Sequence, residues 1–472
     1  MRVDLRGARR SVAGATCRGR LRAPGVPTLE RVVITEPAVS SRAVLRLALP
    51  ALAVLSAEPL YLLVDTAVVG HLGAVPLAGL AIGGVVLAQT ATQLTFLSYG
   101  TTARAARLHG AGRRAEAVAE GVQATWLALL IGVLLLGIGQ LVAGPVARGL
   151  AGAGPIADGA VSWLRVALFG APFVLVTLAG NGWMRGVQDT MRPLRYVLAG
   201  NALSAALCPL LVYGIGPAPQ LGLVGSAIAN VIAQLVSAAL FIRALLVERA
   251  LTGPRWRVMG QQLRLGKDLV LRSIAFQVCF LSAAAVAARS SAAAAAAHQI
   301  VLQLWFFLAL VLDSLAIAAQ ALVGAALGSG EVRRARAVAR QVTRYGLYLG
   351  IALAVVFVAA EPVLPHVFTS DAAVLAQVPY AWWIFAGMQP VAGVVFALDG
   401  VLLGAGDAAF MRTATVVSAA LGFLPLVWAS SAFGWGLLGI WVGLAAFMLV
   451  RLAFVALRVR GDRWAVTGAI RA

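Results

Sequence analysis

Residues 49–73 read LPALAVLSAEPLYLLVDTAVVGHLG, a stretch in which Glu58 and Asp65 are the only acidic or strongly basic side chains. An α-helix needs about 20 mostly apolar residues to cross the hydrocarbon core of a bilayer. The leucines, valines and alanines follow one another without the alternation that marks a half-buried strand. The stretch therefore predicts a membrane-spanning helix that carries two carboxyl groups at bilayer depth.

Similar apolar runs recur along the whole chain of 472 residues. Because 61% of the residues are hydrophobic and only 12% are charged, a soluble domain could not cover its surface. The bilayer accepts only helices or closed barrels, so we predict an all-α integral membrane protein with twelve transmembrane helices. The expected spans lie near residues 44–69, 77–103, 118–142, 160–188, 194–214, 221–247, 268–289, 296–327, 344–368, 377–406, 412–432 and 436–457.

The basic residues cluster between these runs, and alternate junctions hold most of them. Loops rich in Lys and Arg stay in the cytoplasm, so both termini are predicted to be cytoplasmic. The net charge of +20 is thus a topology signal, and no basic face with interleaved aromatic residues indicates a nucleic-acid partner. The basic junctions contain Arg104, Arg107, Arg113 and Arg114, then Arg185, Arg192 and Arg195, then Arg249, Arg255, Arg257, Arg264 and Lys267, then Arg333, Arg334, Arg336, Arg340 and Arg344.

The two ends of the chain are also basic. Residues 1–41 are rich in arginine and poor in acids, which is typical of a transit peptide or of a disordered cytoplasmic tail. We favour the disordered tail, and we assign residues 458–472 to a second cytoplasmic tail.

An internal repeat divides the chain into halves. Gly110-Ala111-Gly112 and Gly328-Ser329-Gly330 each precede an Arg-rich loop, at a spacing of 218 residues. The same spacing places Asn181-Gly182, Gly186 and Asp189 on Asp399-Gly400, Gly404 and Asp407, and a small gap then aligns Gly222–Gly225 with Gly436–Gly439. Three matches in one order predict a duplication.

Six spans per half make both halves enter the membrane in the same direction, so a pseudo-two-fold axis should run along the membrane normal. We predict an N-terminal six-helix lobe of residues 42–250, a cytoplasmic linker of 251–267 and a C-terminal six-helix lobe of 268–457. Halves of this kind are typical of secondary transporters that work by alternating access.

Four acids fall within the expected spans: Glu58, Asp65, Asp313 and Asp399. A carboxylate at bilayer depth is costly unless it is paired, protonated or in contact with water, so each is a functional candidate. We predict that Asp65 binds the coupling ion. For Asp313 and Asp399, ion coupling and a hydrogen bond between helices remain equal alternatives. Glu58 adjoins Pro59 at an expected kink and is interpreted as structural.

Uncharged polar residues mark a possible cavity lining. On span five Asn201, Ser204 and Cys208 share one helix face ahead of Pro209. Such a stripe either lines a cavity or hydrogen-bonds a neighbouring helix. The same two interpretations apply to Ser226 and Asn230 on span six and to Gln299 and Gln303 on span eight.

Enzymatic motifs are absent from the sequence: there is no phosphate loop, zinc-protease helix, nucleophile elbow or dinucleotide fingerprint. Cys17, Cys208 and Cys279 form neither a disulfide framework nor a metal-binding pattern, and His298 has no second ligand at useful spacing. We expect no enzymatic activity, no cofactor and no bound metal. An ion gradient then has to supply the energy for transport.

Taken together, these residues resemble the multidrug and toxic compound extrusion (MATE) family, in its DinF-type branch. Leu49-Pro50 and the stretch 63–73 are similar to the family's first helix. The stretch 181–190 is similar to the end of its fourth span, Gly200-Asn201 to its fifth, and Leu398-Asp399-Gly400 with Gly404-Ala405 to its tenth. The resemblance covers about residues 42–457.

The resemblance implies two six-helix lobes around a central cleft in the inner (plasma) membrane, acting as a monomer. It implies antiport of protons or sodium against small organic, often cationic, compounds, with Asp65 as the cation-coupling residue. It also assigns Asn181, Ser204, Cys208 and Ser226 to the cavity. Where related proteins have a second aspartate this chain has Cys208, so we expect Asp65 to be the only carboxylate of the N-terminal cavity. Asp313 and Asp399 resemble acids of the C-terminal lobe, which could share the coupling.

Two other functions fit the sequence less well. A lipid-linked precursor flippase of the same superfamily usually has a cationic central cavity, whereas the charges within the spans are expected to be acidic here. An integral-membrane enzyme needs a polar catalytic set near one face, and the sequence shows none.

Overall fold

The computed structural model describes residues 40–248, 250 and 252–469, so most of the predicted tail of residues 1–41 lies outside the described range. Within these residues every regular element is a helix. Eleven segments are long and apolar enough to cross a membrane, and one bent pair of helices makes a twelfth. The predicted all-α membrane fold with twelve spans is confirmed.

The helices of the first half correspond to the first six predicted spans. They are α1 (Ser41–Gly70), α2 (Ala74–Leu94), α3 (Phe96–Gly110), α4 (Arg114–Ala151), α5 (Pro155–Ala167), the 3₁₀ turn η1 (Leu168–Gly170), α6 (Ala171–Gly186), α7 (Met191–Tyr213) and α8 (Leu223–Val247). The helices of the second half are α9 (Trp256–Ser290), α10 (Ala292–Gly328), α11 (Val332–Ala360), α12 (Leu364–Phe368), α13 (Ala372–Gly387), α14 (Gln389–Gly404), α15 (Ala408–Ser418), the π-helical turn η2 (Ala419–Phe423), α16 (Leu424–Phe433) and α17 (Gly436–Arg460).

Several helices begin before the apolar run that predicted them. α9 begins at Trp256 and α11 at Val332, although the runs were expected from 268 and 344. The added turns are rich in Arg, Gln, Leu and Ala, which are good helix formers in water as well as in lipid. Residues 256–267, which the sequence placed in a linker, are therefore the first turns of α9.

Proline determines two of the breaks. α11 ends at Ala360 just before Pro362, so the run expected at 344–368 is divided between α11 and the short α12. α13 and α14 meet at an angle of 48°, with Pro390 in the first turn of α14, and together they form the tenth span.

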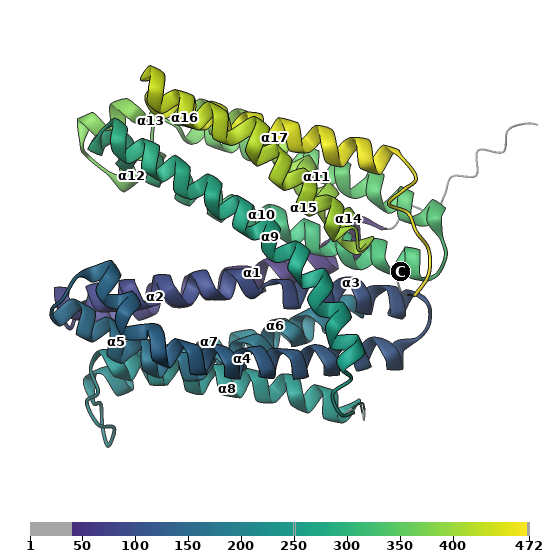
Figure 1. Cartoon of the computed structure of the whole chain (residues 1–472), viewed down its shortest axis with the longest axis horizontal. Helices are drawn as coiled ribbons and strands as arrows, with labels where there is room; N and C mark the ends of the chain where they lie inside the picture. The colour runs from purple at the N-terminus through teal and green to yellow at the C-terminus, as the bar shows by residue number, and fades with distance from the viewer. Residues whose placement is uncertain (1–39, 249, 251, 470–472) are drawn as a thin grey trace, which may run out of the picture. The chain divides into compact units, whose positions relative to one another are not determined.

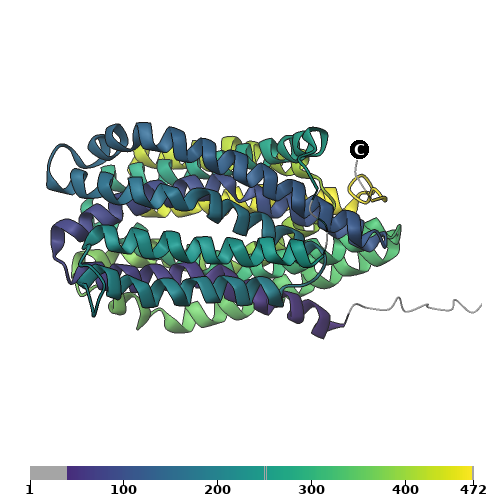
Figure 2. The ribbon, with the colours of Figure 1, turned by 90° about the horizontal axis from the view of Figure 1, so that it is seen from below.

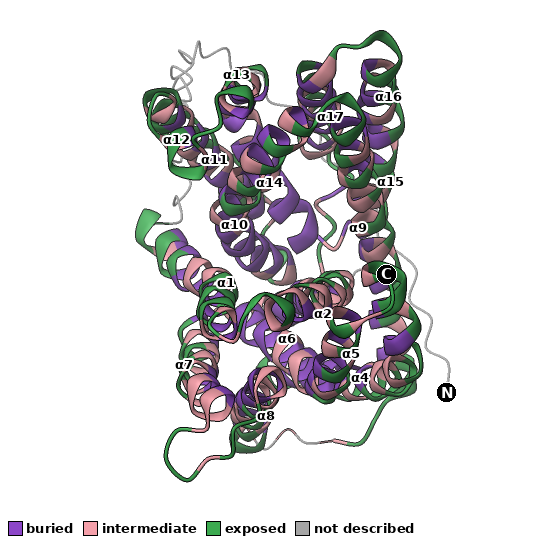
Figure 3. Cartoon of the chain, turned by 90° about the vertical axis from the view of Figure 1, so that its left-hand side faces the viewer, coloured by how far each residue is buried: buried purple, intermediate pink, exposed green. Residues whose placement is uncertain are grey.

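The two sets of helices pack mainly within themselves, and α9 and α10 connect them. α9 contacts α3 and α4 of the first half and α15 to α17 of the second, while α10 contacts α1 and α3 as well as α11, α13 and α14. Figure 1 shows α9 crossing between the sets, and the turned view in Figure 2 shows the long helices running side by side. Seen along the helices in Figure 3, buried residues gather where the helices face one another.

The glycines of the repeat lie at the crossing of α3 and α10. A Cβ atom on Gly110 would lie 1.9 Å from the carbonyl oxygen of Ala325, and a Cβ atom on Gly328 would lie 1.9 Å from that of Arg107. Arg107 and Ala325 are equivalent positions of the repeat, so each contact is the image of the other. The predicted pseudo-two-fold axis therefore passes between α3 and α10.

The segment that follows α17 ties the halves together. Trp464 is fully buried and donates its Nε1 hydrogen bond to the carbonyl of Val459 at 2.9 Å. The Gly468 amide donates to the carbonyl of Leu327 on α10 at 3.1 Å. The guanidinium of Arg107 on α3 donates to the carbonyls of Val466 and Gly468. Part of the predicted tail of residues 458–472 is thus ordered against both halves.

Candidate functional site

A cavity of about 340 Å³ lies within the first half among α1, α2, α5, α6 and α8. Its walls are mostly leucine, valine and alanine, and no Lys or Arg of the described residues lines it. We call it the carboxylate cavity, because its polar lining consists of Glu58, Asp65, Thr66, Thr90, Trp163, Asn230 and Gln234.

Glu58 corrects one expectation from the sequence, which made Asp65 the only carboxylate of this cavity and gave Glu58 a purely structural place beside Pro59. The two acids are seven residues apart on α1, so two helical turns bring them to the same face, and both line the cavity. The seven-residue spacing in the sequence was the signal that could have placed Glu58 on the same helix face as Asp65.

Asp65 is buried, with 2% of its surface exposed, and it contacts two other helices. The thiol of Cys208 on α7 donates to Asp65 Oδ1, with an Sγ to oxygen distance of 3.2 Å. Ser226 on α8 also lies beside the carboxyl group, and its Oγ accepts a hydrogen bond of 2.9 Å from Trp163 Nε1 on α5. The structure therefore brings together three residues that the sequence singled out: Asp65, Cys208 and Ser226.

Of the polar stripe on α7 (Asn201, Ser204 and Cys208), Cys208 contacts α1 through Asp65. Ser204 is buried one turn before Cys208, and Asn201 is half-buried another turn away. Tyr213 at the end of α7 donates to the carbonyl of Val68 on α1 at 2.6 Å. α7 thus holds α1 along the length that carries Asp65.

Three other predicted cavity residues lie elsewhere. Asn181 is buried on α6, where the neighbouring Gly182 packs against Ser98 and Thr101 of α3. Gln299 and Gln303 are exposed on α10 and do not line the carboxylate cavity. α10 contributes no described residue to the lining of this cavity, which spacing on one helix could not show.

Asp399 belongs to a buried ion cluster in the second half. Its Oδ2 atom accepts from Arg272 Nη2 on α9 at 2.9 Å and from Arg451 Nη2 on α17. Both guanidinium groups also contact the ring of Phe276, at 5.6 and 4.8 Å from its centroid. The carboxylate is compensated by two cations, which favours the structural alternative that the sequence left open for Asp399.

Asp313 on α10 contacts α3 several helical turns before Gly328. Tyr99 of α3 donates its hydroxyl hydrogen bond to Asp313 Oδ2 at 2.5 Å, and Gln320 of α10 donates to the Tyr99 carbonyl at 2.7 Å. Arg185 and Arg272 are near enough to act on the carboxyl group electrostatically. Asp313 therefore connects the two halves.

The expectation that charges within the spans are acidic is wrong for the second half. Arg272 and Arg451 lie inside predicted spans, and Arg451 is 2% exposed. Arg185, which the sequence placed at a junction, is 5% exposed. Their presence inside expected spans was visible in the sequence, but their partners are more than fifty residues away along the chain, and only folding identifies them.

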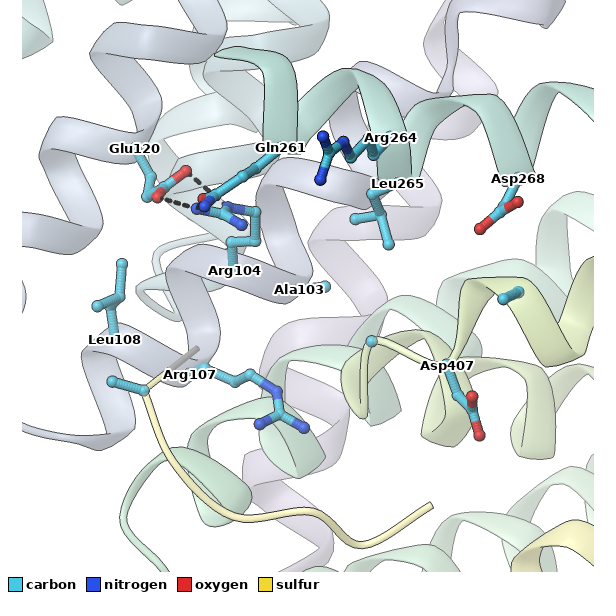
Figure 4. A pocket seen from close by; sticks show the side chains of 13 residues that line it. Ala103, Arg104, Arg107, Leu108, Glu120, Gln261, Arg264, Leu265, Asp268 and Asp407 are labelled. Atoms are coloured by element: carbon cyan, nitrogen blue, oxygen red, sulfur yellow. Dashed lines mark hydrogen bonds and ion pairs between the residues drawn. The ribbon is translucent and has the colours of Figure 1, made fainter. Parts of the chain in front are cut away.

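A second cavity of about 470 Å³ lies at the ends of α3 and α4, beside α9 and the loop before α15. Figure 4 shows Arg104, Glu120 and Gln261 turned toward one another. Arg104 donates to both oxygens of Glu120, at 2.8 and 2.6 Å, and to Gln261 Oε1 at 3.0 Å. Asp407, on the opposite wall, pairs with Arg458 at 2.8 Å. These ion pairs and hydrogen bonds join α3, α4 and α9 at the wall of this cavity.

Comparison with known proteins gives consistent results. The MatE family model matches residues 50–210 and 269–428. The chain is 34% identical to Protein DETOXIFICATION 44, chloroplastic, of Arabidopsis thaliana, over 88% of this chain and 81% of that protein. It is 30% identical to DNA damage-inducible protein F of Escherichia coli, over 87% of this chain and 90% of that protein. A solved MATE structure in the bent conformation shares the fold, with a TM-score of 0.82 at 20% identity over 89% of this chain and 95% of that one.

Proposed function

Since this chain belongs to the MatE family, whose members are multidrug and toxic compound efflux transporters, we propose that it exports small organic cations in exchange for protons. The chain is a multi-pass membrane transporter and not an enzyme, and transporters of this family need no cofactor and are coupled to ion gradients. The proton as coupling ion, the cationic substrate and Asp65 as the coupling residue belong to the proposal.

One observation carries the choice of substrate. The carboxylate cavity has apolar walls, two carboxyl groups and no basic side chain among the described residues. Apolar walls with a few placed polar groups are typical of sites for small organic molecules. A cation gains from two nearby carboxylates in a site of low dielectric, whereas an anion is repelled.

The position of Asp65 supports the proposed coupling. The residue is buried, it lines the cavity, and its partners are the thiol of Cys208 and the hydroxyl of Ser226 rather than a cation. A proton on the carboxyl group removes the charge that attracts the substrate, so proton uptake from outside releases the cargo. Loss of the proton toward the cytoplasm restores the site. Each protonation state favours one arrangement of α1 against α7 and α8, as alternating access requires.

Asp313 and Asp399 have different proposed roles. Asp399 is held by Arg272 and Arg451 and keeps α9, α14 and α17 together. Asp313 is held by a tyrosine hydroxyl across the two halves, so it is the better second candidate for ion coupling.

The decisive experiment is transport by the purified protein in proteoliposomes under an imposed proton gradient and, separately, a sodium gradient. We expect efflux of an organic cation with the proton gradient, and loss of that efflux in Asp65→Asn while the protein still inserts. Asp158→Asn is the matched control, because Asp158 is an exposed carboxylate of the same half outside the cavity. Full proton-driven efflux by Asp65→Asn would show that another residue is the coupling site. Efflux with the sodium gradient alone would show that sodium, and not the proton, is the coupling ion.

A second candidate substrate class is organic anions. Arg451 reaches a cavity of about 140 Å³ whose walls include Phe276, Phe280 and Trp305. The two arginines and one aspartate of this cluster leave an excess of positive charge. Competition between an organic anion and an organic cation in the same proteoliposomes separates the two classes. The family assignment favours either class over a lipid-linked precursor.

From the arginine clusters of the sequence we propose that both termini are cytoplasmic. The plasma membrane as location and the monomeric state are proposed from the family resemblance. The loops after α3, before α9 and before α11 lie at one end of the helices, and those after α1, after α7 and at α12 lie at the other (Figure 1). The Arg-rich loops are thus gathered at one end, which supports the proposed orientation.

A further inference from the structure

Residues 461–469 follow α17, and we call them the strap. The strap is anchored in the second half, because Trp464 is fully buried and donates to the carbonyl of Val459 on α17. Asp462 of the strap also pairs with Arg336 on α11. Figure 1 shows this yellow segment leaving α17 and running past the end of α3. The strap therefore starts from a fixed point in the second half and reaches the first half.

The far end of the strap contacts the first half. Arg107 on α3 is 2% exposed, and its guanidinium donates to the carbonyls of Val466 at 3.0 Å and Gly468 at 3.1 Å. Ala469 packs against an apolar cluster of the first half that includes Leu108. Figure 4 shows the pale yellow segment passing Arg107. The strap thus connects α17 with α3.

The strap lies where the backbones of the two halves meet. The Gly468 amide donates to the carbonyl of Leu327 on α10 at 3.1 Å, one residue before Gly328 of the helix crossing. Arg107 also donates to the carbonyl of Ala405, which follows α14, at 2.8 Å. The Arg-rich loops after α3 and before α11 start at this same end of the helices. One guanidinium group and one amide thus tie the strap to both helices of the crossing.

Alternating access, which belongs to the proposed function and on which this inference rests, requires the halves to separate at each end in turn. Separation at the end with the Arg-rich loops moves α3 away from α10. The anchor at Trp464 and the bond from Gly468 to α10 lie within the second half and do not have to break. The bonds from Arg107 to the strap do have to break, and water can replace them once this end is open.

We propose that the strap is a latch that keeps the transporter closed at the end with the Arg-rich loops and leaves α3 each time that end opens. Hydrogen bonds to a buried charged group stabilise the closed state, and their exchange for water keeps the release reversible. The strength of the latch then sets the fraction of molecules that are open at this end. No residue of the strap lines the carboxylate cavity, so the latch acts on the movement of the halves and not on substrate binding.

Double electron–electron resonance on the purified full-length chain tests the latch, because it measures the distance between the halves without any substrate. Spin labels at Ala115→Cys and Glu331→Cys in the Cys17→Ser protein lie at the exposed starts of α4 and α11. We expect one dominant short distance. In Gly468→Pro a longer distance should gain about ten-fold in population, because proline removes the amide that binds α10 and cannot adopt the φ of 119°, so the strap carbonyls no longer reach Arg107.

The matched control for this variant is Gly216→Pro in the loop after α7, at the opposite end of the helices. Gly216 also has a positive φ, of 70°, and nothing lies within 4 Å of an added Cβ, so the distances should not change. A second variant, Trp464→Ala, removes the anchor and should populate the same longer distance. Trp435→Ala is its control, because Trp435 is exposed just before α17.

Unchanged distances in both strap variants, or the same gain in their controls, would overturn the latch. Efflux by the same proteins in proteoliposomes separates this inference from the proposed function. If the parent protein exports no organic cation but the strap variants still open, the proposed substrate is wrong and the latch is supported. If the parent exports the cation and the strap variants keep the short distance, the latch is wrong and the proposed function stands.

Discussion

The thiol of Cys208 lies 3.2 Å from the carboxylate of Asp65, in the position where the family resemblance led us to expect a second acid. This single side chain determines how the proton site of the carboxylate cavity is built. A thiol donates a weak hydrogen bond and carries no charge of its own, so Asp65 shares its proton with no other group on α7. Glu58, two turns earlier on α1, is the other carboxylate that reaches the cavity.

We predict that Cys208→Asp shifts the pH optimum of efflux upward without abolishing transport. Two carboxyl groups within hydrogen-bonding distance retain one proton between them, because both charges cannot be held so close together. Transport in proteoliposomes across a pH series measures the shift. Cys208→Ser is the control, since its hydroxyl preserves a donor to Asp65, and it should keep the wild-type optimum. An unshifted optimum in Cys208→Asp would show that Asp65 does not set the pH dependence.

We predict that Asp399→Asn lowers the thermal stability of the protein together with its activity. The change leaves Arg272 and Arg451 buried without their counter-charge, and removing one partner of a buried ion pair costs about 3 kcal/mol or more. The melting temperature in detergent reports the loss, with Asp158→Asn as a surface control. Normal stability with defective efflux would instead assign Asp399 to ion coupling, the other alternative that the sequence left open.

At the scale of helices, the two halves approach each other closely at the crossing of α3 and α10. The backbones approach so closely that Gly110 and Gly328 each face the carbonyl group of a residue on the partner helix. Small residues permit such crossings in membranes, where packing and hydrogen bonds rather than hydrophobicity hold helices together. Tyr99 and Asp313 add a hydrogen bond across the same pair of helices.

We predict that Gly110→Ala and Gly328→Ala each lower the melting temperature and the yield of folded protein. The added methyl group would stand 1.9 Å from a carbonyl oxygen, so the helices have to separate. Gly137→Ala is the matched control on α4, because nothing lies within 4 Å of its added Cβ and alanine favours the helix. If the two crossing variants are as stable as Gly137→Ala, the halves do not meet as the structure places them.

For the whole molecule, the testable property is orientation. Single cysteines at Ala115, Pro254 and Glu331 should react with a membrane-impermeant maleimide only after the membrane is opened, and those at Val75, Gln220 and Ser370 should react in intact cells. All six positions are exposed in loops or helix ends, and Cys208 and Cys279 are buried. A parent protein with Cys17→Ser provides the unlabelled control. Labelling of Glu331→Cys in intact cells would contradict the positive-inside arrangement.

The sequence by itself determined the class of molecule, its twelve spans, its duplication and the family. Hydropathy, charge clusters and repeat spacing depend only on the order of residues along the chain. It also identified Asp65, Cys208 and Ser226, which meet in the structure. Only the tertiary structure decided which charges inside the membrane are paired: Asp399 with Arg272 and Arg451, and Asp313 with Tyr99. These partners come from helices far apart in the chain, and no spacing relates them. The structure also showed that Glu58 lines the carboxylate cavity and that Gln299 and Gln303 do not, because the packing of neighbouring helices determines which residues surround a cavity.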